Sequence, residues 1–252
     1  MSAPKNIPRI SIGDLVEQNY VFAAVLYFFG INFFEYEKKS LDEVCKRFKV
    51  NPVQLMEELE SWAIKKEPSR EELYLHPIEV LVEYLKKKHY FFLRQELPFL
   101  SNMISGIRAE AGYEPILEDM KLMFPLFVDD FIHHIHEEEN TVFRRIAQLH
   151  QIERGEFNMI EALALLETTP ISSLAEEHEV HDDEMEGIRK LTSDYLLTPS
   201  APVAIKVLYQ ELQHFERELI IHAKIENDLL FPKAAELERE VKRKLVNTIK
   251  WN

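Results

Sequence analysis

The chain has 252 residues, 46% of them hydrophobic and 29% charged, which allows one large domain or a main domain with a small one. Its formal net charge of -14 argues against nucleic acid or an anionic membrane surface as a partner, because both need a basic face. A single cysteine, Cys45, excludes an internal disulfide and a thiolate metal cluster within one chain. The first residues show no secretory signal pattern, so we expect a cytoplasmic protein in which histidines and carboxylates bind any metal.

The N-terminal part of the chain predicts short helices. Six glycines and few β-rich runs favour an all-α fold. We expect one helix over about 14–29 that ends at Gly30, one over 41–48 with a capping box, and one that opens at Pro52. They form a small helical N-terminal domain, residues 1–65, and the charged segment 66–76 is interpreted as a linker.

Residues 77–252 contain four long helical patterns and predict a four-helix bundle. The first pattern starts at Pro77 and is expected to kink at Pro98, and the second spans about 116–150, with Pro125 as a possible irregularity. The third covers about 172–197. The fourth begins near Pro202 and continues past Glu226, and Pro232 is expected to separate it from a final helix over 233–249.

Two of these patterns repeat one motif, in which a Glu follows a His by four residues and a Phe follows it by nine. The members are His134, Glu138 and Phe143, and then His222, Glu226 and Phe231. Residues four apart share one face of a helix, so each His–Glu pair points the same way. Because a buried, unpaired carboxylate is costly, a cation is the usual remedy. His89 and His178 would add one imidazole from each of the other two long helices.

Four imidazoles and two carboxylates suit a pair of iron, manganese or zinc ions better than calcium or magnesium. The alternative is a solvated, ion-paired helix face, which is what a single His–Glu pair more often marks. The neighbours of the first pair cannot all share its face and are interpreted as surface residues or as supports for the ligands: His133, His136, Glu137 and Glu139. His181, three residues after His178, is a weaker candidate ligand.

Four segments together carry a specific resemblance over almost the whole chain: RQELPFL at 94–100, HIHEEENTVF at 134–143, EEHEVHDDEMEGIRKLTSDY at 176–195 and HAKIENDLLFPKA at 222–234. They resemble the hemerythrin-like di-iron proteins, and among these the iron–sulfur cluster repair proteins (repair of iron centres). The resemblance implies a hemerythrin-like bundle that holds two iron ions, oxo-bridged when oxidised. The implied metal ligands are His89, His134, Glu138, His178, His222 and Glu226. The family's histidine pair falls on His89 and Tyr90, so Tyr90 stays an alternative ligand.

The small helical unit also resembles that family's N-terminal domain, through SIGDLVEQN, FFGINFF and SLDEVCKRF. Phe34 and Glu35 stand where the family has a Cys–Cys pair, so thiol chemistry is not expected in this domain. Arg144 replaces a proline of the motif, which should be structurally mild. The apolar run at 20–34 is the place where we expect the contact of a homodimer.

The resemblance implies a role in repairing iron–sulfur clusters damaged by nitric oxide or oxidative stress, with damaged iron–sulfur proteins as partners. Two alternatives stay open. One is a hemerythrin-like binder or sensor of dioxygen or nitric oxide that performs no turnover. The other is a helical interaction protein that has lost its metal. Whether the protein is an enzyme is left undecided by the sequence.

Overall fold

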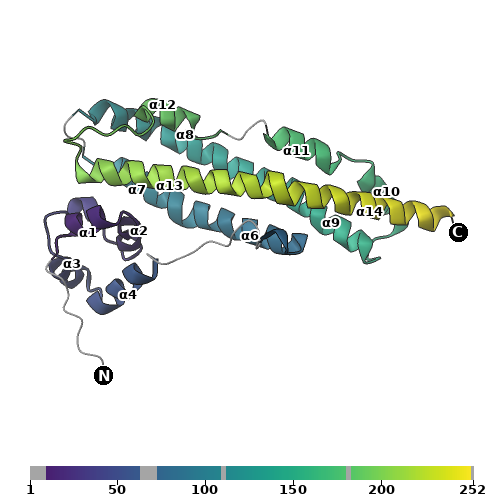
Figure 1. The fold of residues 1–252 in the computed structure, drawn as a ribbon, viewed down its shortest axis with the longest axis horizontal. Coiled ribbons are helices and arrows are strands. Elements are labelled where there is room, and N and C mark those ends of the chain that lie inside the picture. The colour runs from purple at the N-terminus through teal and green to yellow at the C-terminus, as the bar shows by residue number, and fades with distance from the viewer. Residues whose placement is uncertain (1–9, 63–72, 109–111, 180–182, 251–252) are drawn as a thin grey trace, which may run out of the picture. The chain divides into compact units, whose positions relative to one another are not determined.

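The computed structural model describes residues 10–62, 73–108, 112–179 and 183–250, apart from the side chains of 62, 177–179 and 249–250. Within these ranges the regular elements are helices, and the one β-type contact is an isolated bridge between Ser11 and Ser40 (Figure 1). The all-α prediction is therefore confirmed. Among the helices in this part of the chain, none combines the length and apolar character needed to cross a membrane.

The N-terminal residues form four α-helices where three were expected: α1 (Ile12–Gln18), α2 (Val21–Phe28), α3 (Leu41–Phe48) and α4 (Pro52–Trp62). The prediction of a single helix over 14–29 was wrong, because the helix breaks at Asn19. The backbone of Asn19 is extended, and its side-chain oxygen accepts the N–H of Val21 at 3.2 Å, an alternative to continuing the helix. The capping box of Ser40 and Glu43 is present, and Gly30 has the positive φ of 76° that ends α2.

By their contacts the residues group into two compact units. The first comprises Met1–Glu67, Leu93–Leu126 and Glu186–Glu216, and the second Pro68–Phe92, Phe127–Met185 and Arg217–Asn252. In the first unit the ring of Phe34 packs so closely on Gly106 that a Cβ added to this glycine would lie 2.8 Å from ring carbons. This grouping does not test where an independently folding N-terminal domain would end, so the predicted domain boundaries stay a prediction.

Three π-helical turns interrupt the long helices. The α-helical parts are α6 (Ile78–Phe91), α7 (Leu97–Gly106), α8 (Glu114–Glu138), α9 (Arg144–Glu153), α13 (Val203–Ile225) and α14 (Phe231–Lys250). The π turns are η2 (Phe92–Glu96), η3 (Glu139–Phe143) and η4 (Glu226–Leu230). Each joins two of these α-helices without a gap, α6 to α7, α8 to α9, and α13 to α14.

Pro125 and Pro232 act differently from the prediction, and the kink expected at Pro98 stays a prediction. Pro98 and Pro232 are each the second residue of the α-helix that follows a π turn, so Pro232 does not separate two helices. A proline ring in a regular helix clashes with the carbonyl four residues earlier, and the wider π turn relieves this clash. Pro125 lies inside α8, which continues through it.

The third long pattern, over about 172–197, forms two described helices, α11 (Ile171–Glu179) and α12 (Glu186–Thr192). Seven acidic residues lie between positions 176 and 186, and such like charges disfavour a continuous helix. The three residues after α12, Ser193, Asp194 and Tyr195, all have positive φ angles of 52–59°, which ends the helix. A short helix, α10 (Met159–Leu166), lies in the segment that joins the second and third patterns.

The second unit is organised around α14, which contacts α9, α10 and α11, while α6 contacts η4. Its core includes the fully buried side chains of Leu81, Leu85, Leu149, Ile171 and Leu230. This core surrounds the π turns η3 and η4, both of which contribute buried residues to it. Apolar packing of these buried residues thus holds both turns in place.

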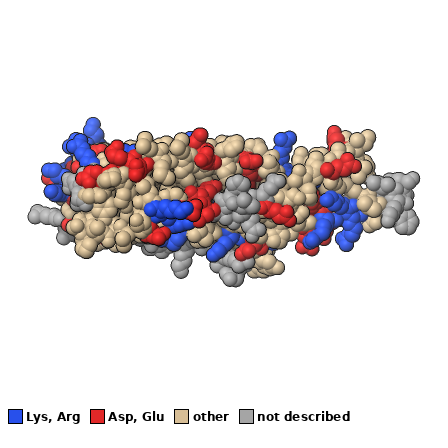
Figure 2. Space-filling model, turned by 90° about the horizontal axis from the view of Figure 1, so that it is seen from above, with Lys and Arg blue, Asp and Glu red and all other residues tan. Residues whose placement is uncertain are grey.

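Acidic and basic side chains are interspersed on the face of the molecule that Figure 2 shows. The net charge of -14 is therefore not gathered into one acidic patch on this face. The predicted absence of nucleic-acid and membrane partners stays a prediction.

A buried ion pair joins α9 to α14. Arg145 and Glu238 are each 5% exposed, and an Nη of Arg145 lies 2.7 Å from Oε1 of Glu238. Arg145 also donates to the hydroxyl of Thr168 at 2.7 Å and to the carbonyl of Leu165. Removing one partner leaves the other charge buried, so Glu238→Leu should lower the free energy of unfolding by about 3–5 kcal/mol.

Denaturant unfolding of three variants tests this expectation. Adding Arg145→Met to Glu238→Leu should recover most of the loss, because a buried pair replaced by apolar residues is often close to neutral. Glu236→Leu changes an exposed carboxylate of the same helix and serves as the control. A loss no larger for Glu238→Leu than for Glu236→Leu would contradict the structural role of the pair.

Candidate metal centre

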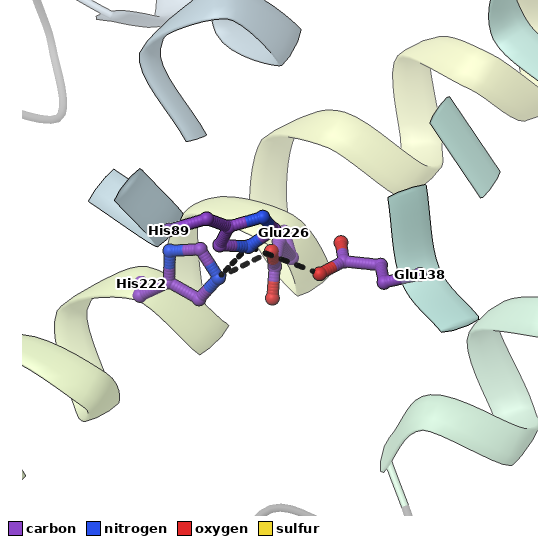
Figure 3. A group of neighbouring side chains, drawn as sticks. All are labelled: His89, Glu138, His222 and Glu226. Atoms are coloured by element: carbon purple, nitrogen blue, oxygen red, sulfur yellow. Dashed lines mark hydrogen bonds and ion pairs between the residues drawn. The ribbon is translucent and has the colours of Figure 1, made fainter. Parts of the chain in front are cut away.

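Four buried side chains of the second unit meet at one point: His89 from α6, Glu138 at the end of α8, His222 from α13 and Glu226 at the start of η4 (Figure 3). One donor atom from each lies within 4.8 Å of all the others. The residues are between 0% and 8% exposed. Two imidazoles and two carboxylates thus share a small, enclosed volume; one comes from α6, one from α8 and two from the continuous helix of α13 and η4.

The distances suit coordination of an ion. Nε2 of His89 lies 3.1 Å from Nε2 of His222 and 3.3 Å from Oε2 of Glu138. Nε2 of His222 lies 2.7 Å from Oε1 of Glu226. Two nitrogens bound to one ion at about 2.1 Å, in neighbouring positions, are separated by about 3 Å. The two imidazoles are therefore already placed as neighbouring ligands.

Each helix that supplies a member of this group changes to a π turn at or just after that residue. The turn η2 begins three residues after His89, η3 follows Glu138 directly, and η4 starts with Glu226. A π turn adds one residue to the helical repeat and is common at functional sites. Beside the group, Lys88 and Glu218 form a largely buried ion pair at 2.6 Å that ties α6 to α13.

The π turn η3 has no proline, since Arg144 stands at that position. Its side chains bond instead to carbonyls of the last turn of α8: Asn140 donates to the carbonyl of His136 and Thr141 to that of Glu137, each at 2.7 Å. The N–H of Arg144 donates to the carbonyl of Glu139, five residues back. The turn therefore forms with or without a proline, as expected for a structurally mild replacement.

The electrostatics of the group favour a bound cation. Burial raises the pKa of the Glu138 carboxyl, and the nearby charge of Glu226 raises it further. Burial and the neighbouring His89 lower the pKa of His222 to about 3. Burial also lowers the pKa of His89, but Glu138 and Glu139 outweigh this and the net shift is upward.

The buried polar atoms of the group that lack a hydrogen bond to the described residues include Oε1 of Glu138 and Nδ1 of His222. A cation at the centre would offset the buried negative charge and satisfy the carboxylate oxygens. Imidazole and carboxylate together are donors that suit iron, manganese or zinc. The residues present thus fit the kind of metal that the sequence predicts.

Not all predicted ligands join this group. The side chain of His134 is 28% exposed; its Nδ1 lies 3.9 Å from Oε1 of Glu184, and its ring stacks near Phe131. The side chain of His178 and the whole of His181 lie outside the described residues. Tyr90, the alternative to His89, is 63% exposed. The structure therefore brings together four of the six predicted ligands and leaves the assignments of the other two as predictions.

Two carboxylates lie near these ligands; the contact of Glu184 was not predicted, and that of Glu139 matches the alternative in which it supports a ligand. Oε1 of Glu139 lies 2.8 Å from Nδ1 of His89, and Glu184 adjoins His134. Sequence spacing assigned Glu139 to the surface side of a regular helix, with support for a ligand as the alternative. The two helix-weakening residues that follow it, Asn140 and Thr141, are a signal that the helix is not regular there.

The phenylalanines of the repeated motif are both buried. Phe143 stacks on His89 with ring centroids 5.6 Å apart and an interplanar angle of 6°, and Phe231 is 4% exposed. Phe92 meets the ring of His222 edge-on at 5.6 Å. Aromatic side chains thus form an apolar wall against both imidazoles of the group.

Comparisons with known proteins agree with this geometry. Residues 80–234 match the model of the hemerythrin HHE cation binding domain, which is 155 of the 252 residues. The iron-sulfur cluster repair protein ScdA of Staphylococcus haemolyticus is 23% identical over 223 residues, 88% of this chain and 96% of that protein.

Two further relatives are similar over a smaller part. The ScdA protein of Staphylococcus epidermidis is 24% identical over 159 residues, 63% of this chain and 67% of the relative. The iron-sulfur cluster repair protein YtfE of Yersinia pseudotuberculosis is 24% identical over 174 residues, which are 68% of this chain and 73% of that protein. The match of more than half of the chain to the family model, on residues that hold the buried His and Glu group, shows that this chain belongs to the hemerythrin HHE cation-binding family.

Proposed function

We propose that this chain is a cytoplasmic di-iron protein that takes part in the repair of iron–sulfur clusters damaged by nitric oxide or oxidative stress. The observation that carries the proposal is the buried group of His89, Glu138, His222 and Glu226 within the hemerythrin HHE domain. Relatives that are named iron-sulfur cluster repair proteins support the role in repair. Damaged iron–sulfur proteins are accordingly the proposed partners.

The four buried residues would hold iron together with His134 and His178. This set would supply imidazole nitrogens and carboxylate oxygens, donors that suit iron. When bound, iron supplies redox chemistry and exchangeable positions for small ligands. The side chain of His134 is 28% exposed, so it is the most solvent-accessible of the proposed ligands whose side chains the structure describes.

The protein's own residues bind, orient and shield. Phe143 and Phe92 cover the two imidazoles, and Phe131 packs edge-on against Phe92 at 5.9 Å. This apolar wall keeps water from the inner side of the ligands and strengthens their electrostatic interactions. Small diatomic molecules, being compact and weakly polar, would pass such a wall more easily than hydrated ions.

A reversible binder or sensor of dioxygen or nitric oxide is the second candidate. The N-terminal part favours it, because Phe34 packs on Gly106 and Glu35 accepts a bond from the side chain of Asn32 at 3.1 Å. These two residues therefore act in packing and local hydrogen bonding, at the positions where the resemblance places thiols. A repair function would have to rest on the metal centre alone.

The proposed homodimer concerns the apolar run at 20–34. Val25, Leu26, Ile31 and Phe33 are buried within their own chain, whereas Phe28 is 42% exposed. A dimer contact through this run would therefore have to use Phe28 and its partly buried neighbours.

Metal content tests the centre. The wild-type protein, reconstituted with ferrous iron without oxygen and then exposed to air, should contain about two irons per chain by mass spectrometry and show near-ultraviolet charge-transfer absorption. The double variant Glu138→Gln, Glu226→Gln should lose most of this iron, because neutral amides replace the two anionic ligands. Glu137→Gln, an exposed neighbour, should keep it. A double variant with full iron content would contradict the assigned ligands.

A repair assay separates the two candidate functions. A [4Fe–4S] enzyme inactivated by nitric oxide should recover faster with the iron-loaded wild-type protein than with the Glu138→Gln, Glu226→Gln variant. Reversible spectral change on adding gas, with no effect of either protein on recovery, would instead support the binder or sensor. Wild-type protein that takes up no metal would favour the helical interaction protein.

A further inference from the structure

We infer that Glu139 is a positioning residue that holds His89 with its Nε2 directed into the metal centre. The inference rests on the proposed metal site and gives a defined role to a residue that the sequence left as either a surface residue or a support for a ligand. It also gives a reason why His89 is the ligand from α6, where the resemblance leaves a choice between His89 and Tyr90.

The hydrogen bond between these residues determines which ring nitrogen carries hydrogen. Oε1 of Glu139 lies 2.8 Å from Nδ1 of His89. A carboxylate oxygen accepts, so the ring donates through Nδ1, and a neutral imidazole then has its lone pair on Nε2. Nε2 is the atom that lies 3.3 Å from Glu138 and 3.1 Å from His222. Glu139 therefore selects the form of His89 that can bind a metal.

Glu139 is the first residue of the π turn η3 and directly follows the ligand Glu138. Glu138 and Glu139 are consecutive, and in a regular α-helix their side chains would leave the axis about 100° apart. Here Glu138 approaches Nε2 of His89 while Glu139 approaches Nδ1 of the same ring. Phe143, the last residue of η3, stacks on the face of that ring. Glu138 at the end of α8 and two side chains of η3 thus restrain a single imidazole on two edges and one face.

The second imidazole of the group has no such partner. Nδ1 of His222 is buried and forms no hydrogen bond with the residues that the structure describes. His89 is also the more buried ring, at 1% exposure against 8% for His222. The side chain of Glu139 is 35% exposed, so it links a buried ligand to the surface. Carboxylates that orient metal-binding histidines in this way commonly change metal affinity by 10–100-fold when removed.

The test compares ferrous iron binding by four full-length proteins under anaerobic competition with a chromogenic chelator: wild type, Glu139→Ala, Glu139→Gln and Glu137→Ala. Glu139→Ala should weaken binding by about 10–100-fold. Glu139→Gln keeps an oxygen that accepts from Nδ1 and should retain most of the affinity. Glu137 is exposed and precedes the proposed ligand Glu138 in the sequence, so the Glu137→Ala variant should bind iron like the wild type.

A second readout distinguishes positioning from a general loss of structure. In the zinc-loaded, diamagnetic proteins, ¹H–¹⁵N correlation spectra of the histidine rings should show His89 with hydrogen on Nδ1 in the wild type and in Glu139→Gln. In Glu139→Ala this signal should shift or broaden, while the thermal unfolding of the metal-free protein stays close to that of Glu137→Ala.

Equal affinity of wild type and Glu139→Ala would overturn the inference and leave the proposed function intact, since the metal would still be bound. Equal losses in Glu139→Ala and Glu139→Gln, or in Glu139→Ala and Glu137→Ala, would also overturn it. Absence of metal binding by the wild type itself would overturn both the inference and the proposed di-iron centre. The behaviour of the wild type thus separates the two failures.

Discussion

The cost of burying two carboxylates and two imidazoles at one point governs the structure of the second unit. Glu226 is fully buried and Glu138 nearly so, and without a counter-charge such groups are among the least favourable in a protein interior. The upward pKa shift of Glu138 and the downward shift of His222 express this conflict. A core that nevertheless holds these four groups within 4.8 Å is organised to receive a cation.

That organisation depends on helices that depart from regular geometry. Glu138 ends α8, and the turn η3 that follows supplies Glu139 and Phe143; all three contact the ring of His89. The chain accommodates its π turns by different chemistry in different helices. After η2 and η4 a proline, Pro98 or Pro232, disfavours the regular helix. In η3 the side chains of Asn140 and Thr141 donate to the backbone carbonyls of His136 and Glu137.

Sequence periodicity was sufficient for the helical class and for the meeting of His222 with Glu226, because residues four apart share a helical face. The same spacing linked His134 to Glu138, but only Glu138 joins the buried group. Periodicity failed where the helix changes its repeat. Pro232 was expected to separate two helices and instead follows a π turn, and for Glu139 the spacing left the surface and the support of a ligand as alternatives without deciding between them. The break at Asn19 was missed for a related reason, since a side-chain bond to the backbone outweighed a continuous apolar pattern.

The first helix shows how local geometry decides between adjacent residues. His89 and Tyr90 are neighbours on α6, and a rotation of about 100° separates their side chains. His89 is 1% exposed and contacts Glu138, Glu139, Phe143 and His222, whereas Tyr90 is 63% exposed. A phenolate at this point would add a third anion to two buried carboxylates, whereas a neutral imidazole adds none. The same charge balance that requires a cation at the centre therefore favours histidine as the ligand from this helix.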